Sequence, residues 1–234
     1  MNKRSLITLI LLIVVLPALA VAGLFLFGSK GYIPVALAVA LLSLAPLFYA
    51  FERKSHSAWE LAVLAVMIAF SALGRVVFAF LPSFKPVTAM AVIAGIYLSK
   101  EAGFITGALS AVISNFYFGQ GPWTPFQMCI WGLLGLLAGL LCTPLKRSRW
   151  YLALFGALAG IVYSLGMDVF TALWMDGTLV WARYGALIVS ALPVTAAYAV
   201  SNVIFLLLLT RPIGEKLTRI KVKYGLFSPR KPSE

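Results

Sequence analysis

Long runs of apolar residues alternate with short polar or charged segments along the whole chain. A run of about 20 apolar residues is the length that crosses the hydrocarbon core of a bilayer as an α-helix. The shorter, alternating segments typical of a membrane β-barrel are not found. The pattern therefore predicts an all-α polytopic membrane protein with eight spans, near residues 6–27, 33–51, 58–81, 86–99, 102–118, 125–143, 150–174 and 185–210.

Composition agrees with this prediction and removes one class of partner. Hydrophobic residues make up 62% of the 234 positions and charged residues only 11%, whereas a soluble domain keeps roughly a quarter of its residues charged. The net charge of +12 raises the possibility of nucleic-acid binding. The basic residues, however, cluster in short segments between spans and in the tail, where they would face anionic lipid. We therefore expect no nucleic-acid partner.

No set of residues indicates catalysis. His56 is the only histidine, and the chain has no phosphate-binding glycine loop with lysine, no H-E-x-x-H and no G-x-S-x-G. Cys129 and Cys142 fall on one predicted helix, roughly 20 Å apart, which is too far for a disulfide. Neither has a neighbour at metal-ligand spacing. We expect a protein that is not an enzyme, with no resident cofactor or metal and with two cysteines that pack as apolar side chains.

The chain divides into three predicted parts. Residues 1–57 form a hairpin of two aliphatic spans followed by a basic linker, residues 58–210 form a six-span bundle, and residues 211–234 form a basic tail. The first span has a second interpretation, because its basic start and the small residues at 18–20 resemble a secretory signal with a cleavage site. Its apolar run continues to Phe27, long enough to span the membrane, which favours an uncleaved helix.

The distribution of lysine and arginine predicts the orientation. With the N-terminus in the cytoplasm, fifteen of these residues are cytoplasmic and four lie at or near the outer side. Such an excess on one side is typical of the cytoplasmic face of a plasma-membrane protein. Both termini are therefore expected inside, and the turn at 82–86, the segment at 115–128 and the loop at 175–184 are expected outside.

The segment at 115–128, N-F-Y-F-G-Q-G-P-W-T-P-F-Q-M, is the strongest candidate for recognising a polar molecule. Glycine and proline bend the backbone, and aromatic rings such as Trp123 accompany hydrogen-bonding groups on Asn115, Gln120, Thr124 and Gln127. We call this segment the elbow. Its rings offer stacking surfaces to a flat ligand, although aromatic residues also gather at membrane interfaces without any ligand.

Three charged residues lie close to the elbow. Arg75 and Asp168 are each about six residues before the predicted outer end of a span, a depth at which a charge normally faces protein or a water-filled cavity. Equal depth favours their pairing and a role in lining a ligand cavity, against a purely structural salt bridge or an arginine that extends to the interface. Lys85 precedes Pro86 at the start of a helix and is expected over the outer mouth, either to meet an anion or as an interfacial lysine.

Alanines form a continuous stripe along the third span, at Ala58, Ala62, Ala65, Ala69, Ala72 and Ala79. Small residues allow helices to approach closely in lipid. The stripe therefore indicates either packing within the bundle or a docking surface for another membrane subunit.

Four features carry a resemblance to a known family: the alanine stripe, F-K-P-V-T at 84–88, E-A-G-F at 101–104 and S-N-F-Y-F-G-Q-G-P-W-T-P-F-Q-M at 114–128. Together they resemble the substrate-binding S component of energy-coupling-factor (ECF) transporters, and most of all its cobalamin-type members. The resemblance covers about two-thirds of the chain. The hairpin at 1–57 departs from the six-helix minimum of that family.

The resemblance implies an ABC-type importer subunit that binds a vitamin, here cobalamin or a related corrinoid, at the outer face. It implies docking through Ala62, Ala65, Ala69 and Ala72 onto a transmembrane coupling protein that works with two cytoplasmic ATPases, and toppling of the S component to release its ligand inward. The expected substrate contacts are Arg75, Lys85, Asn115, Gln120, Trp123, Thr124, Gln127 and Asp168. The alternatives are another vitamin or a queuosine-type base, and a membrane scaffold that transports nothing.

Overall fold

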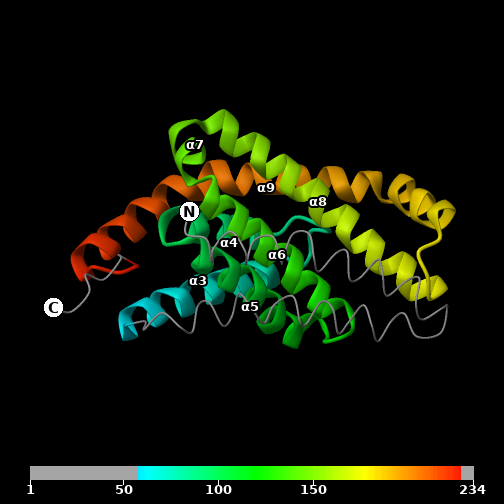
Figure 1. The fold of residues 1–234 in the computed structure, drawn as a ribbon, viewed down its shortest axis with the longest axis horizontal. Coiled ribbons are helices and arrows are strands. Elements are labelled where there is room, and N and C mark those ends of the chain that lie inside the picture. The colour runs from blue at the N-terminus through cyan, green and yellow to red at the C-terminus, as the bar shows by residue number, and fades with distance from the viewer. Residues whose placement is uncertain (1–56, 228–234) are drawn as a thin grey trace, which may run out of the picture.

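The computed structural model describes residues 57–227, and all regular structure in this part of the chain is helical (Figure 1). The helices are α3 (Ala58–Val77), α4 (Val87–Tyr97), α5 (Lys100–Phe118), α6 (Trp123–Leu140), α7 (Cys142–Arg147), α8 (Arg149–Asp176) and α9 (Trp181–Tyr224). The predicted all-α membrane bundle is confirmed, because α3, α6, α8 and α9 are long and apolar enough to cross a membrane. The predicted hairpin at 1–57 lies outside the described residues except for Ser57, as do residues 228–234.

Two groups of connections define the ends of the bundle. We call one the elbow end, where the turn at 78–86 and the short connection at 119–122 lie. The other is the α7 end, where α7 links α6 to α8 and the last turns of α9 meet the end of α4. Lys221 of α9 donates a hydrogen bond there to the carbonyl of Leu98, over 2.7 Å. Figure 1 shows α8 leading away from α7 and α9 returning alongside it.

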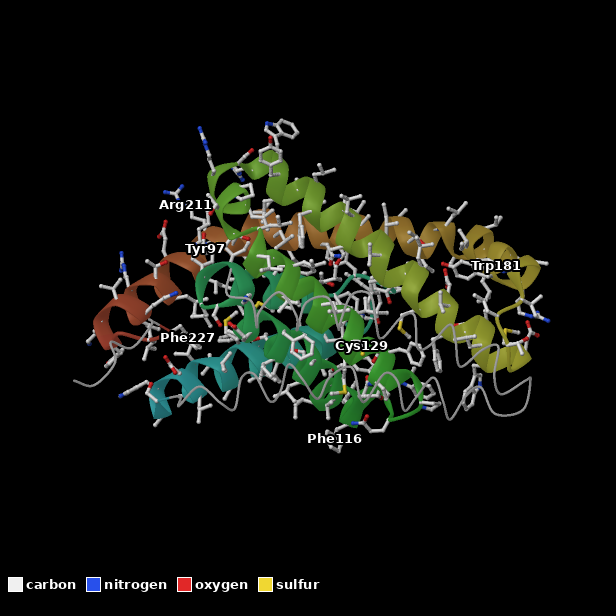
Figure 2. The ribbon with its side chains drawn as sticks, in the orientation of Figure 1. Tyr97, Phe116, Cys129, Trp181, Arg211 and Phe227 are labelled. Carbon is white, nitrogen blue, oxygen red and sulfur yellow. The ribbon has the colours of Figure 1, made fainter. Side chains whose placement is uncertain are left out.

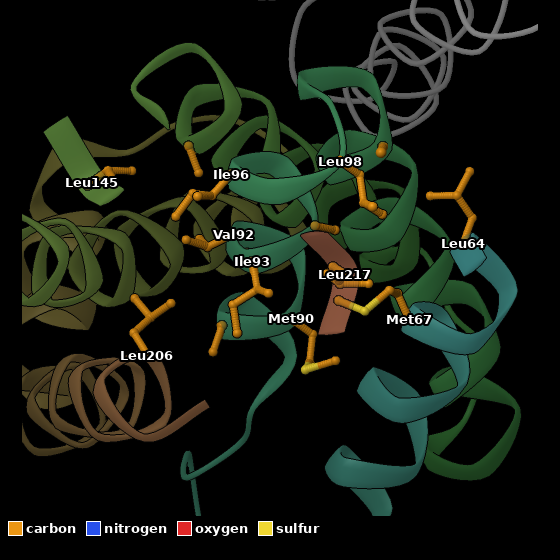
Figure 3. Packing of buried hydrophobic residues seen from close by; sticks show 14 of the residues in the cluster. Leu64, Met67, Met90, Val92, Ile93, Ile96, Leu98, Leu145, Leu206 and Leu217 are labelled. Atoms are coloured by element: carbon orange, nitrogen blue, oxygen red, sulfur yellow. The ribbon is translucent and has the colours of Figure 1, made fainter. Parts of the chain in front are cut away.

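Helix α4 is the centre of the bundle. Every residue from Val87 to Ile96 is buried, and α4 contacts each of the other described helices. Its 11 residues are too few to cross a bilayer on their own, and an apolar helix of this length is more typical of a protein core. Figure 3 shows side chains of α4, among them Val92 and Ile93, surrounded by Met67, Leu206 and Leu217 from other helices.

Glycines bring α4, α5 and α6 into backbone contact. A methyl group at Gly135 of α6 would overlap the carbonyl of Gly103 of α5, and one at Gly95 of α4 would overlap the carbonyl of Gly135. Small residues at helix crossings permit this approach in a membrane, where close van der Waals packing drives association.

Helix α5 departs from the expectation of a simple span. It has 19 residues, yet it is not among the four helices whose composition suits a membrane crossing. Its buried side chains include the polar residues Thr106, Ser110, Ser114 and Asn115. These groups face the interior of the bundle, so that α5 depends on its neighbours to satisfy them.

Helix α9 is longer than the predicted span at 185–210. It begins at Trp181 and continues to Tyr224, through Pro193 and Pro212. Residues 211–224 are therefore helical and packed, where the sequence predicted the start of a basic tail. Leu217 is buried in the core, and a side chain at Gly214 would overlap the ring of Tyr97. Tertiary contacts extend the helix beyond the apolar run because packing, as well as lipid, covers one of its faces.

Cys129 and Cys142 form no disulfide within the described residues, as predicted, and both are partly buried. They belong to different helices, since α6 ends at Leu140 and Cys142 begins α7. Each packs against a hydrophobic cluster, which confirms that they serve as apolar packing residues.

Candidate substrate-binding site

Most of the elbow is helical. Helix α5 continues through Phe118 and ends at Gly119, whose φ of +96° is readily adopted only by glycine. Helix α6 begins at Trp123, directly after Pro122. The bend is thus confined to residues 119–122, and the polar elbow residues on either side of it face one another from two antiparallel helices.

A chain of side-chain hydrogen bonds crosses the elbow end from α3 to α8. The Nη1 of Arg75 donates to the Oδ1 of Asn115 over 2.7 Å and to the hydroxyl of Ser114 over 2.6 Å. The amide of Asn115 donates to the Oε1 of Gln127 over 2.8 Å, and the Nε2 of Gln127 donates to the hydroxyl of Tyr163 over 3.2 Å. We call the series Arg75, Asn115, Gln127 and Tyr163 the relay.

Asn115 is the centre of this arrangement. Its side chain is fully buried, and its amide also donates to the hydroxyl of Thr124 over 2.8 Å. Its oxygen accepts from Arg75, so every strong hydrogen-bonding group of the amide is in use. Such a buried network holds its members in one geometry, since breaking any bond would leave a buried polar group unsatisfied.

Aromatic rings surround the relay. The guanidinium of Arg75 lies 4.6 Å from the ring centre of Phe118 and 5.1 Å from that of Trp131. Trp131 stacks on Tyr163 with ring centres 4.7 Å apart and planes 7° apart, and Tyr198 meets Tyr163 edge-on at 4.9 Å. The relay therefore combines amide groups with flat aromatic faces, the two kinds of group that recognise a planar heterocycle.

The predicted pairing of Arg75 with Asp168 is wrong. Arg75 lies in the last turn of α3, which ends at Val77, four residues earlier than predicted, and its hydrogen bonds go to α5. Asp168 lies on α8, and its buried Oδ2 has no hydrogen-bond partner among the described residues. Arg75 lies two residues before the end of α3, whereas Asp168 lies eight residues before the end of α8 at Asp176, so the two are not at equal depth. Asp168 thus offers an acceptor that the bundle leaves unused.

Lys85 is held by the backbone of its own turn. Its ammonium donates to the carbonyls of Phe78 and Leu81, the latter over 2.7 Å, and its backbone N–H donates to the hydroxyl of Ser201 over 2.9 Å. The pKa of Lys85 is lowered, first by burial and second by the charge of Arg75. In the structure this lysine caps the exposed carbonyls after α3, so a role toward an anionic ligand would require it to exchange those bonds.

Gln120 and Trp123 lie at the edge of the cluster. Gln120 is exposed, and its amide joins two helices by donating to the carbonyl of Val112 over 2.9 Å and accepting from Thr124 over 3.1 Å. The ring of Trp123 packs against Gly121. Both residues shape the bend, while the buried relay lies beneath them.

Comparison with known families decides what kind of protein this is. The family model described as "ECF-type riboflavin transporter, S component" matches residues 55–219, most of the chain. The chain belongs to this family. No curated protein and no solved structure matches it. The family is one of transporter subunits and not of enzymes, and it confirms the predicted S component, its multi-pass membrane location and its work together with an ECF module.

The family model does not establish which substrate this S component binds. The family description names riboflavin, whereas the resemblance seen in the sequence was to cobalamin-type members. Within residues 57–227, no group of three or more His, Cys, Asp and Glu side chains is placed to hold a metal ion.

The alanine stripe of the S component faces outward along most of its length. Ala62, Ala65 and Ala69 are exposed, whereas Ala72 is buried against the bundle. Next to the exposed alanines, Val66 and Phe70 are also exposed. Packing within the described bundle therefore accounts for Ala72 but not for the other three positions.

Sequence reasoning missed several members of the site, namely Ser114, Trp131, Tyr163 and Tyr198. A signal for the tyrosines was available, because a tyrosine in the middle of an apolar span needs a partner for its hydroxyl. The spacing of Ser114 beside Asn115 gave no such signal, since a serine in a membrane helix can bond to its own backbone. Ser114 does so as well, donating to the carbonyl of Ser110 over 2.6 Å.

Proposed function

We propose that this S component captures a planar, hydrogen-bonding vitamin of the riboflavin type at the relay. The observation that carries the proposal is the continuous series of buried and partly buried hydrogen bonds from Arg75 to Tyr163, set beside the stacked rings of Trp131 and Tyr163. A flavin ring has carbonyl and N–H groups along one edge and two apolar faces. The relay supplies amides for such an edge and rings for such faces.

Binding would proceed by exchange of hydrogen bonds. Asn115 and Gln127 now satisfy one another, so a ligand edge that inserts between them must replace each bond with an equivalent one. A ligand that supplies both a donor and an acceptor does this at little cost, whereas an apolar ligand leaves two buried amides unsatisfied. This rule explains how a closed polar cluster can select a heterocycle and reject a hydrocarbon of the same size.

Asp168 extends the proposed site toward α9. Its unpartnered Oδ2 suits a hydroxyl donor, and the side chain of riboflavin is a chain of hydroxyls. Ser164 lies one turn before Asp168 on α8, and its hydroxyl is 2.7 Å from that of Thr195 on the neighbouring α9. We assign Arg75, Asn115, Thr124 and Gln127 to the ring and Asp168 to the polyol, with Lys85, Gln120 and Trp123 at the entrance.

A corrinoid is the second candidate, because the elbow sequence resembles cobalamin-type S components. Such a ligand is several times larger than riboflavin and would require the helices at the elbow end to separate. The fully buried Asn115 and the close contact of α5 with α6 favour the smaller ligand. The vitamin would in either case be a transported substrate and not a cofactor.

Delivery would depend on docking. We assign the exposed Ala62, Ala65 and Ala69 to contact with the transmembrane coupling protein, with Ala72 continuing the stripe into the bundle. The two ATPases of the module would act on the cytoplasmic side, where the charge distribution predicts both termini. The elbow end would then face outward before docking.

Titration of the purified full chain with riboflavin, followed by quenching of flavin fluorescence, tests the ligand. We expect saturable binding that is lost in Asn115→Ala and weakened in the milder Gln127→Glu, while Ser190→Ala, an exposed serine outside the relay, binds as the wild type does. Each variant is first checked for an unchanged helical circular dichroism spectrum. Binding of a corrinoid with no binding of riboflavin would reverse the order of the two candidates, and binding of neither would refute vitamin capture at the relay.

Docking is tested separately by uptake in cells that contain an ECF module. The double variant Ala65→Leu/Ala69→Leu should lose uptake and keep ligand binding, whereas Ala196→Leu, at an exposed alanine of α9, should keep both. Full uptake by the double variant would show that the stripe is not the docking surface.

A further inference from the structure

A cavity opens at the α7 end, far from the relay. It has a volume of about 710 Å³ and is lined by residues of α4, α7, α8 and α9. No residue of α3, the helix of the alanine stripe, contributes to its lining. The cavity therefore belongs to neither the proposed vitamin site nor the proposed docking stripe, and its chemistry has to be explained on its own.

The charges around the cavity are mainly positive. Four basic side chains line it, Lys146, Arg149, Arg211 and Arg219, against one carboxylate, Glu215. The Nε of Arg211 pairs with Glu215 at 3.0 Å, and the Nζ of Lys146 lies 4.8 Å from the ring centre of Tyr97. Figure 2 shows Arg211 and Tyr97 close together at this end. Apart from the ion pair of Arg211 with Glu215, the other three basic lining residues have no carboxylate partner among the lining residues.

Most of the remaining lining is apolar and leads to the lipid-facing surface. Leu145 and Leu152 are almost fully buried, whereas Leu208 is 65% exposed. Thr210 is buried in the same wall, and its hydroxyl has no hydrogen-bond partner in the described part of the chain. The cavity thus has a charged rim, one unused polar group and an apolar wall open toward the bilayer.

Neighbouring residues place this rim at the level of the lipid headgroups. Trp150 and Tyr151 directly follow Arg149, and both are exposed, at 86% and 58%. Exposed tryptophan and tyrosine concentrate where the hydrocarbon meets the headgroups. Arg149 also stands in the first turn of α8, which has neither an acidic residue there nor a side-chain cap. An arginine at this position is unfavourable to the helix dipole unless an anion lies nearby.

From these observations we propose that the cavity binds an anionic phospholipid, with the headgroup phosphate among Arg149, Arg211 and Arg219 and an acyl chain along Leu208. Basic pockets between membrane helices recognise such headgroups by charge, and the apolar wall selects a lipid over a soluble phosphate. The lipid would hold α7, α8 and α9 together where these helices leave a gap.

Lipid binding to the full-length protein in a neutral detergent tests the proposal, with a fluorescent phosphatidylglycerol as probe and a phosphatidylcholine as comparison. We expect saturable binding of phosphatidylglycerol and at least tenfold weaker binding of phosphatidylcholine. The variant Arg149→Gln/Arg219→Gln should weaken phosphatidylglycerol binding about 25-fold, since each basic residue near an anionic lipid contributes roughly fivefold. These side chains are exposed, so the fold should not suffer.

The matched control is Arg147→Gln/Lys223→Gln, which removes two basic residues from the same end without touching the cavity lining. It should weaken binding less than about threefold. Equal weakening in the two double variants would mean a diffuse charge effect and would overturn the proposal, as would equal binding of the two lipids. Competition by glycerol phosphate at the concentration of the lipid would assign the cavity to a soluble phosphate instead. Loss of coupling-protein capture by Arg149→Gln/Arg219→Gln, with lipid binding intact, would assign it to a protein partner.

Discussion

The two ends of this S component use polar residues in opposite ways. At the elbow end, Arg75 and Asn115 lie inside the bundle, and their partners are other side chains. At the α7 end, Arg149, Arg211 and Arg219 line an open cavity, and the one ion pair there is exposed on both sides. A closed network can select a ligand by shape and hydrogen-bond pattern, whereas an open basic cluster acts mainly through its charge.

The difference follows from how closely the helices approach. Helices α5 and α6 touch through their backbones where Gly107 meets Trp131, about one turn beyond Gln127, which leaves the relay side chains between them no room for bulk water. At the other end, α7 lies between α6 and α8 in the chain, and long basic side chains of α9 line an open cavity. Polar groups deprived of water must bond to one another, and those with access to it need not.

The largest effect should come from breaking the backbone contact between α5 and α6. Gly135→Leu would force a side chain into the backbone of α5 and lower the apparent free energy of unfolding by at least about 4 kcal/mol, because backbone cannot move aside as a side chain can. Unfolding by sodium dodecyl sulfate in mixed micelles measures this. Gly185→Leu is the control, since a side chain at Gly185 meets nothing within 4 Å and should change stability by less than about 0.5 kcal/mol.

The second-largest effect compares the loss of stability on removing one arginine from each end of the bundle. Arg75→Ala leaves the buried oxygens of Ser114 and Asn115 without their charged donor and should cost about 3 kcal/mol of unfolding free energy. Arg211→Ala removes an exposed ion pair and should cost less than about 1 kcal/mol. The same unfolding titration measures both. Similar costs for the two variants would contradict the contrast between a closed and an open end.

A smaller loss of stability is expected on changing Tyr163, the last residue of the relay, on α8. Tyr163→Phe keeps the ring stacked on Trp131 and removes only the hydroxyl that accepts from Gln127, at a cost of about 1 kcal/mol. Riboflavin binding should weaken about fivefold, as measured by flavin fluorescence. Tyr184→Phe is the control, because its hydroxyl lies 3.4 Å from its acceptor and outside the relay. Unchanged binding in Tyr163→Phe would remove Tyr163 from the proposed site.

The smallest expected effect is the pH dependence of stability that Lys85 contributes, in the turn next to the relay. Burial and the charge of Arg75 lower the pKa of Lys85, so between that pKa and about 10.5 the unfolded state binds more protons than the folded state. The free energy of unfolding should therefore rise with pH through this window. The destabilising contribution of charged Lys85 is complete below its pKa in the folded state and is gone above its pKa in the unfolded state. Thermal unfolding between pH 8 and 10.5 should show this rise for the wild type, relative to Lys85→Met. Lys85→Arg, whose side chain stays charged throughout, should also lack the rise in stability. A rise that persists in Lys85→Arg would belong to another titrating group.

The candidate site was predictable in its residues but not in its bonds. Asn115, Thr124 and Gln127 stand out in the sequence because amides and hydroxyls are rare in an apolar chain. Their mutual bonding, and the inclusion of Tyr163 from more than 30 residues away, depend on the crossing of α5, α6 and α8. The pairing of Arg75 with Asp168 failed because a depth counted along the sequence contains an error of several residues at each helix end.

The sequence by itself determined the membrane class, the helical architecture and the family of this protein, since these depend on composition, on the length of apolar runs and on local motifs. Tertiary structure alone decided that α4 is a buried helix, that α9 extends to Tyr224, that the relay is closed and that a basic cavity opens beside α7. An apolar residue has the same tendency to leave water whether lipid or protein receives it. Which of the two surrounds a helix is therefore settled only when the helices pack.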